Sequence, residues 1–177
     1  MSTSSDSKRE LLRHTLATVA YRGGKAVTFA PAGFNSFSAH ETTRTPEQIL
    51  AHIGDLYDWA LSLARGKQTW HNSTPQAWDA EVERFFATVK AFDDYLASEE
   101  QLHCPAEKLF QGPVADSLTH IGQIAMLRRM AGIPVAPENF VVADIDSERL
   151  GPDQPDPVSP DEIWPEAPPG WSSPHSD

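Results

Sequence analysis

The sequence predicts an all-α protein: a four-helix bundle followed by an extended, Pro-rich C-terminal segment. Apolar residues recur at helical spacing in four stretches before residue 133, and no alternating strand pattern of comparable length occurs there. Ten of the fifteen prolines lie between Pro134 and Pro174, which argues against a helix in that part of the chain. We therefore expect a bundle over residues 1–132 and a Pro-rich acidic tail over residues 133–177, partly packed on the bundle.

The first predicted helix covers residues 7–29, with Asp6 or Ser7 as its N-cap. Its apolar stripe consists of Leu12, Leu16, Val19 and Ala26. Gly23 and Gly24 interrupt the pattern, and each costs about 1 kcal/mol relative to alanine inside a helix. The two glycines indicate either close packing against a neighbouring element or a local break near a site.

A capping box predicts the start of the second helix. Thr45 can cap, Pro46 fits the first turn, and Gln48 can reach back to the backbone of Thr45. Gly66 is expected to end this helix. The pair Thr74–Pro75 repeats the start signal and predicts a third helix from that point.

The third and fourth stretches complete the bundle. The third stripe consists of Trp78, Val82, Phe85, Val89, Phe92 and Leu96. The fourth helix is expected over residues 114–131, where Gly132 followed by Pro134 would close it. A short helical turn is expected before it, at residues 106–110.

Composition narrows the classes of function. At 177 residues and 40% hydrophobic content, the chain can form one ordinary domain with a core. The net charge of −11 and the lack of a basic stripe make nucleic acid a poor partner. One cysteine, Cys104, excludes an intrachain disulfide, and we interpret it as incidental. No signal peptide or membrane span is apparent, so we expect a soluble, cytoplasmic protein.

The candidate functional site is a metal site. Asp116 and His120 stand four residues apart in the fourth helix, so their side chains lie on one face, and His120 falls on the apolar stripe. His52 occupies the same kind of position in the second helix. Two histidines and one carboxylate are a common ligand set for Zn, Ni or non-haem Fe. The alternative is that both histidines are hydrogen-bonded core residues.

Other polar residues near these positions are weaker candidates. Gln123 lies one turn beyond His120 and is either a partner that orients its ring or a surface residue. Asp55 and Tyr57 are more simply interpreted as packing or surface residues. His40 precedes the second helix and is the remaining histidine that could reach this end of the bundle.

The motifs His52-Ile-Gly-Asp-Leu-Tyr-Asp-Trp59 and Leu118-Thr-His-Ile-Gly-Gln-Ile124 together resemble the DinB/YfiT-like family of metal-binding bundles. The resemblance covers about residues 7–132 and implies an up-down-down-up bundle with a divalent metal near one end. It places His52 at the ligand from the second helix and His120 at the last ligand. Asp116 departs from the pattern, because the family usually has a histidine there, and the alternative is a lost metal site.

The resemblance implies an enzyme that activates a small thiol or water at the metal, such as a thiol transferase acting on a small molecule. The competing hypothesis is a non-catalytic bundle that forms a homodimer or binds a partner through the tail. Trp164 and Trp171 would then be contact residues of that tail. Nothing in the sequence identifies the thiol, the electrophile or a dedicated general base.

Overall fold

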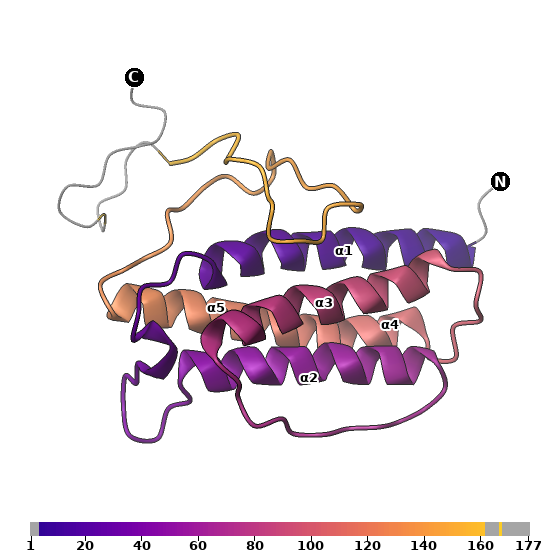
Figure 1. Ribbon diagram of the computed structural model, residues 1–177. Coiled ribbons are helices and arrows are strands. Elements are labelled where there is room, and N and C mark those ends of the chain that lie inside the picture. Colours follow the sequence, from indigo (N-terminus) through magenta and orange to yellow (C-terminus); the bar gives the residue numbers. More distant parts are fainter. Residues whose placement is uncertain (1–3, 162–166, 168–177) are drawn as a thin grey trace.

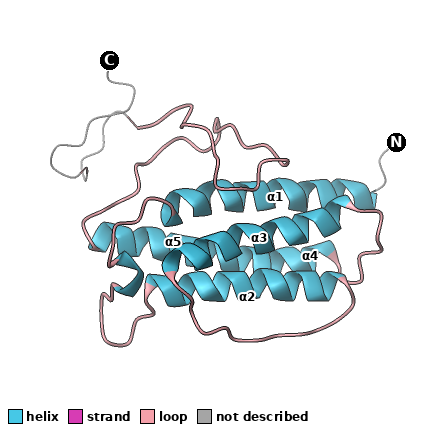
Figure 2. Ribbon diagram, in the orientation of Figure 1, coloured by secondary structure: helices cyan, strands magenta, loops and turns pink. Residues whose placement is uncertain are grey.

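The computed structural model describes residues 4–161 and residue 167, and within them every regular element is helical (Figure 2). The four long helices are α1 (Ser4–Val27), α2 (Pro46–Ala64), α3 (Trp78–Ala97) and α5 (Ala115–Met130). Shorter elements join them: the 3-10 helix η1 (Phe34–Ser36), α4 (Ala106–Leu109) and the π-helix η2 (Phe110–Val114). The all-α prediction is confirmed. No described helix combines the length and the apolar character needed to cross a bilayer.

The four long helices lie side by side around one apolar core (Figure 1). The apolar faces of the four helices supply this core, because Leu16 of α1, Ile53 of α2, Phe85 of α3 and Ile124 of α5 are each fully buried. Each such side chain contributes about 1.5–3 kcal/mol by leaving water. Packing of the core sets how α2 and α5 are rotated about their axes. It therefore determines which of their side chains lie at the edge of the core.

The directions of the helices explain why the connection between α2 and α3 is long. Helices α1 and α5 run one way, and α2 and α3 run the other way (Figure 1). Because α2 and α3 are parallel, the chain between them must return along the length of α2. It does so through residues 65–77, which we call the return loop, and the residues of its first half are all exposed.

The Gly23–Gly24 pair serves packing, since α1 continues through it without a break. A Cβ added at Gly23 would lie 2.5 Å from the ring of Phe85, and one added at Gly24 would lie 3.4 Å from Phe86. The two phenylalanines of α3 therefore pack directly against the backbone of α1. Of the two interpretations open from the sequence, close packing is the one that the structure supports.

The predicted start of α2 is confirmed, that of α3 is wrong, and α1 begins at Ser4, ahead of its predicted N-cap at Asp6 or Ser7. Thr45 and Gln48 form the complete capping box, with Pro46 in the first turn of α2. Helix α3 begins at Trp78 and not at Thr74–Pro75. The residues before it are held outside the helix, since the backbone N–H of Gln76 donates to the buried Glu81 carboxylate (2.8 Å).

Helix α5 continues from α4 through the π-helix η2. Pro113 lies inside that segment, and a proline offers no N–H for the helical ladder. The wider π turn accommodates the missing hydrogen bond, and the helix resumes at Ala115, one residue before Asp116. Gly132, with a φ of 77°, closes the helix as predicted.

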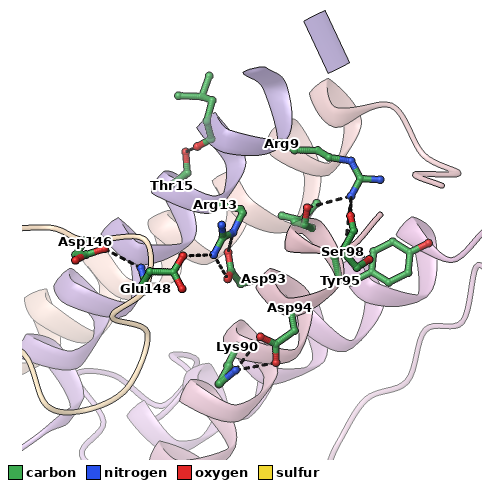
Figure 3. A network of polar contacts seen from close by, with 12 residues as sticks. Arg9, Arg13, Thr15, Lys90, Asp93, Asp94, Tyr95, Ser98, Asp146 and Glu148 are labelled. Atoms are coloured by element: carbon green, nitrogen blue, oxygen red, sulfur yellow. Dashed lines mark hydrogen bonds and ion pairs between the residues drawn. The ribbon is translucent and has the colours of Figure 1, made fainter. Parts of the chain in front are cut away.

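The segment after α5 is non-helical and lies along α1 (Figure 1). Glu138 is buried and accepts hydrogen bonds from the Tyr21 hydroxyl (2.9 Å) and from Lys25. Further along, Arg13 of α1 binds both Asp93 of α3 and Glu148 of this segment (Figure 3). The tail residues Trp164 and Trp171, proposed as contacts for a partner, lie outside the described residues.

Candidate metal centre

The structure brings together the three residues predicted as ligands. His52 comes from the middle of α2, and Asp116 and His120 come from the first turns of α5. Each offers one ligand atom, and these atoms all lie within 4.8 Å of one another. The His52 Nε2 atom is 3.7 Å from Asp116 Oδ2, and the two imidazole rings are 4.7 Å apart between centroids.

This spacing fits a divalent ion. Bonds of about 2.1 Å to a tetrahedral ion place neighbouring ligand atoms about 3.4 Å apart, so only a small closure of the observed cluster is needed. Two imidazoles and a carboxylate suit Zn, Ni or Fe by donor type. The geometry therefore permits a three-ligand site with further coordination positions left for small molecules.

A backbone carbonyl sets the tautomer of His120. The Nδ1 atom is 2.9 Å from the backbone oxygen of Asp116, and a carbonyl oxygen can only accept a hydrogen bond. In the neutral ring Nδ1 therefore carries the proton, which also faces the Asp116 carboxylate (Nδ1 to Oδ1, 3.2 Å), and Nε2 is the nitrogen without a proton. Asp116 thus has two roles, because its carboxylate joins the cluster and its carbonyl orients the ring of His120.

The surroundings of His52 favour its neutral, metal-binding form. Burial lowers the pKa of His52, and the positive charges that His120 and Arg44 can carry lower it further, against a smaller opposing effect of Asp116. The His52 and His120 side chains are 19% and 12% exposed, whereas that of Asp116 is 45% exposed. The site is thus open to solvent on the carboxylate side.

Two tryptophans border the site on the His52 side. The Trp70 ring meets the His52 ring edge-on at 5.7 Å between centroids, and Trp59 meets Trp70 at the same distance. Trp59 belongs to α2, while Trp70 belongs to the return loop. The loop therefore adds an apolar wall to a site whose donors all come from helices.

Buried Asp55 fastens the return loop to α2. Its carboxylate accepts hydrogen bonds from the Ser73 backbone N–H (2.8 Å) and hydroxyl (2.6 Å), and from Arg84 of α3 (2.6 Å). Burial alone would raise the pKa of Asp55, but these hydrogen bonds hold it below its usual range. Gly54 leaves room for the guanidinium, since a Cβ there would lie 2.9 Å from Arg84 Cζ.

A second group of potential ligands forms around the same carboxylate. Asp55, Asp58 and His71 lie close enough to share an ion. The Arg84 guanidinium already pairs with both carboxylates, at 2.6 Å and 2.9 Å, and supplies the positive charge that they need. We therefore assign this group to structure, with Arg84 in the position of the cation.

The weaker candidates have other roles. Tyr57 is fully buried, and its hydroxyl is 2.6 Å from that of Ser117, which joins α2 to α5 beside the site. Gln123 makes no hydrogen bond to His120 among the described residues, and His40 lies in the turn before α2, outside the cluster. Burial raises the pKa of the Cys104 thiol, consistent with an incidental cysteine.

The tryptophan wall and the Asp55–Arg84 contact were missed from the sequence. His71 and Trp70 occur in a polar stretch without periodicity, so no local pattern marks them as neighbours of α2. The spacing of Asp55 and Asp58 on one helical face was the only available signal. No protein-family model, curated protein or solved structure matches this chain.

Proposed function

We propose that this chain is a divalent-metal-binding bundle protein of the DinB/YfiT-like type, in which His52, Asp116 and His120 hold the ion. The antiparallel placement of α1 and α5 relative to α2 and α3 supports the up-down-down-up topology. The origin of the donors, one from α2 and two from α5, supports the ligand assignment.

One observation carries the proposal: three potential ligands from two helices converge at a place that remains open to solvent. A purely structural histidine pair would need only mutual packing. Here each donor group faces the others, and the half-exposed carboxylate of Asp116 leaves an approach for a small molecule.

The proposed activity is metal-dependent transfer to a small thiol, with hydrolysis by an activated water as the related reaction. His52, Asp116 and His120 would hold the divalent ion, which would lower the pKa of a thiol or water bound to it. In the transfer, a thiol sulfur bonds to an electrophilic carbon, the leaving group departs with the bonding electrons, and the thiol proton passes to solvent. His52 stays neutral, His120 keeps its tautomer through Asp116, and Trp70 limits the entry of water.

The first test is the metal content of the purified protein by elemental analysis. We expect near-stoichiometric metal in the unaltered protein and loss of most of it in Asp116→Ala and His120→Ala. His14→Ala and Asp94→Ala are matched controls, because both residues are exposed and lie outside the cluster. Both controls should retain the metal.

Protein that stays empty after incubation with Zn, Ni and Fe would overturn the proposal. Equal metal in all four variants would overturn the ligand assignment. If the ion binds as expected, the loaded protein is assayed with small thiols and electrophiles, and turnover should fall to background in Asp116→Ala.

A further inference from the structure

A groove lies on the same two helices as the candidate metal centre. It is an apolar groove of about 510 Å³ between the start of α2 and the second half of α5. Its apolar lining includes Ile49, Met126, Leu127 and Met130, and its polar lining consists of His40, Thr43, Arg44 and Gln123. The volume falls within the range of about 300–1,000 Å³ typical of small-molecule sites.

The groove adjoins the candidate ligands. Ile49 precedes His52 by three residues on α2, and Gln123 follows His120 by three residues on α5, so each lies about one helical turn from a ligand. Arg44 is close enough to contribute to the lowered pKa of His52. A molecule bound in the groove would therefore reach the edge of the metal centre.

Hydrogen bonds on both sides hold the backbone around Arg44. On one side, the N–H and hydroxyl of Thr43 both donate to the backbone oxygen of His40, at 2.9 Å and 2.8 Å. On the other side, Thr45 begins the capping box. The Arg44 side chain makes no hydrogen bond or ion pair with any described residue, although the whole chain carries a net charge of −11.

The apolar lining of the groove can adapt its shape. Met126 and Met130 are 56% and 57% exposed, which is a high value for large apolar side chains. Methionine is flexible and polarisable, and such surfaces adjust to ligands of differing shape. A guanidinium beside two exposed methionines offers one charged contact and one apolar contact to the same molecule.

We propose that this groove binds a small organic anion with an apolar body, whose anionic group pairs with Arg44 and whose body covers Met126 and Met130. The proposal that the anion binds in the groove depends on these residues alone. Its assignment as the substrate subsite of the metal centre rests on the proposed function above.

The chain itself supplies the reporters for a test. It has three methionines, and two of them line the groove. In protein labelled with ¹³C at the methionine methyl groups, hexanoate should shift the Met126 and Met130 signals in a saturable manner, both with and without added zinc. Hexanol, which lacks the charge, and acetate, which lacks the body, should each bind about tenfold more weakly or less.

Arg44→Gln should raise the dissociation constant for hexanoate about tenfold, while Lys67→Gln, an equal change of charge at the far end of α2, should leave it unchanged. Equal shifts with hexanoate and hexanol, or unchanged binding in Arg44→Gln, would overturn the proposal. Hexanoate binding that requires zinc would also overturn it, because the anion would then bind the ion. Hexanoate binding without zinc, in a protein that never takes up metal, would support the groove as a binding site. It would exclude only the assignment of the groove as the substrate subsite of a metal centre.

Discussion

His52 is an acid-sensitive residue of the folded protein. Its pKa is lowered below the ordinary value of 6.5, with burial as the main cause. The unfolded chain therefore takes up this proton at a higher pH than the folded chain does. The contribution of neutral His52 to stability is present above pH 6.5 and is lost as the pH falls towards the lower folded pKa.

This gives a direct titration experiment. Imidazole NMR should show His52 titrating below its ordinary value of 6.5, and the pKa of His52 should rise in both His120→Ala and Arg44→Gln. The rise should be larger in His120→Ala, because His120 has the stronger effect of the two. A His52 pKa that is unchanged in both variants would mean that burial alone sets it.

Asp55 is the residue on which the return loop depends. Asp55→Asn removes the charge from a carboxylate whose side chain is 3% exposed and leaves Arg84 with a weaker partner. We expect a loss of about 3 kcal/mol in the free energy of unfolding, measured by urea denaturation. Asp58→Asn is the matched control at 38% exposure, and it should cost less than about 1 kcal/mol.

Asp55 makes stability depend on pH for a different reason from His52. Hydrogen bonds stabilise the charged form of Asp55, whereas burial disfavours the charged form of His52. The folded-state pKa of Asp55 lies below its ordinary value of 3.8, so its stabilising effect is present above that pH and is lost as the pH falls through the folded value. Asp55→Asn should therefore be less sensitive to acid below about pH 4 than the unaltered protein. Parallel acid curves for the two proteins would contradict this role.

Among the helices, the contact between α1 and α3 gives the sharpest prediction. Gly23→Ala gains about 1 kcal/mol in helix propensity, but its Cβ would lie 2.5 Å from Phe85 and 3.2 Å from Ile121. Overpacking of this kind costs about 1–3 kcal/mol, so we expect net destabilisation in thermal unfolding.

Gly24→Ala is the matched control for this contact. Its nearest neighbour, the Phe86 ring, is at 3.4 Å, an ordinary contact distance. This variant should be as stable as the unaltered protein or more stable by up to about 1 kcal/mol. If Gly23→Ala were stabilising as well, the two helices would be less tightly packed than the structure indicates.

The sequence predicts the long helices and the candidate ligands better than it predicts the return loop. Stripe periodicity located the four long helices, and the spacing of Asp116 and His120 with the stripe position of His52 identified three side chains that the structure brings together, because these patterns are properties of single helices. Long-range contacts set the remainder. Ser73 is bound to Asp55 of α2, so the chain stays extended past Thr74–Pro75, and the helix begins only at Trp78.

At the scale of the whole molecule, the segment after α5 is joined to α1 through one buried carboxylate. Glu138→Ala would remove the partner of both Tyr21 and Lys25. We expect a loss of about 2–3 kcal/mol in stability and faster proteolysis of the segment over residues 133–161.

Glu148→Ala tests whether that result depends on burial. Glu148 also binds α1, through Arg13, but its side chain is 76% exposed (Figure 3). This variant should cost less than about 1 kcal/mol and leave proteolysis nearly unchanged. Similar effects of the two variants would show that the segment is held by its apolar contacts and not by Glu138.

The parallel course of α2 and α3 also has a consequence for how such a protein can diversify. The return loop is fastened at Ser73, while residues 66–72 are exposed and contribute nothing to the apolar core. Substitution of the partly exposed Trp70 side chain would alter the wall beside His52 at little cost in folding. The scaffold can thus keep His52, Asp116 and His120 together while the surface beside them changes.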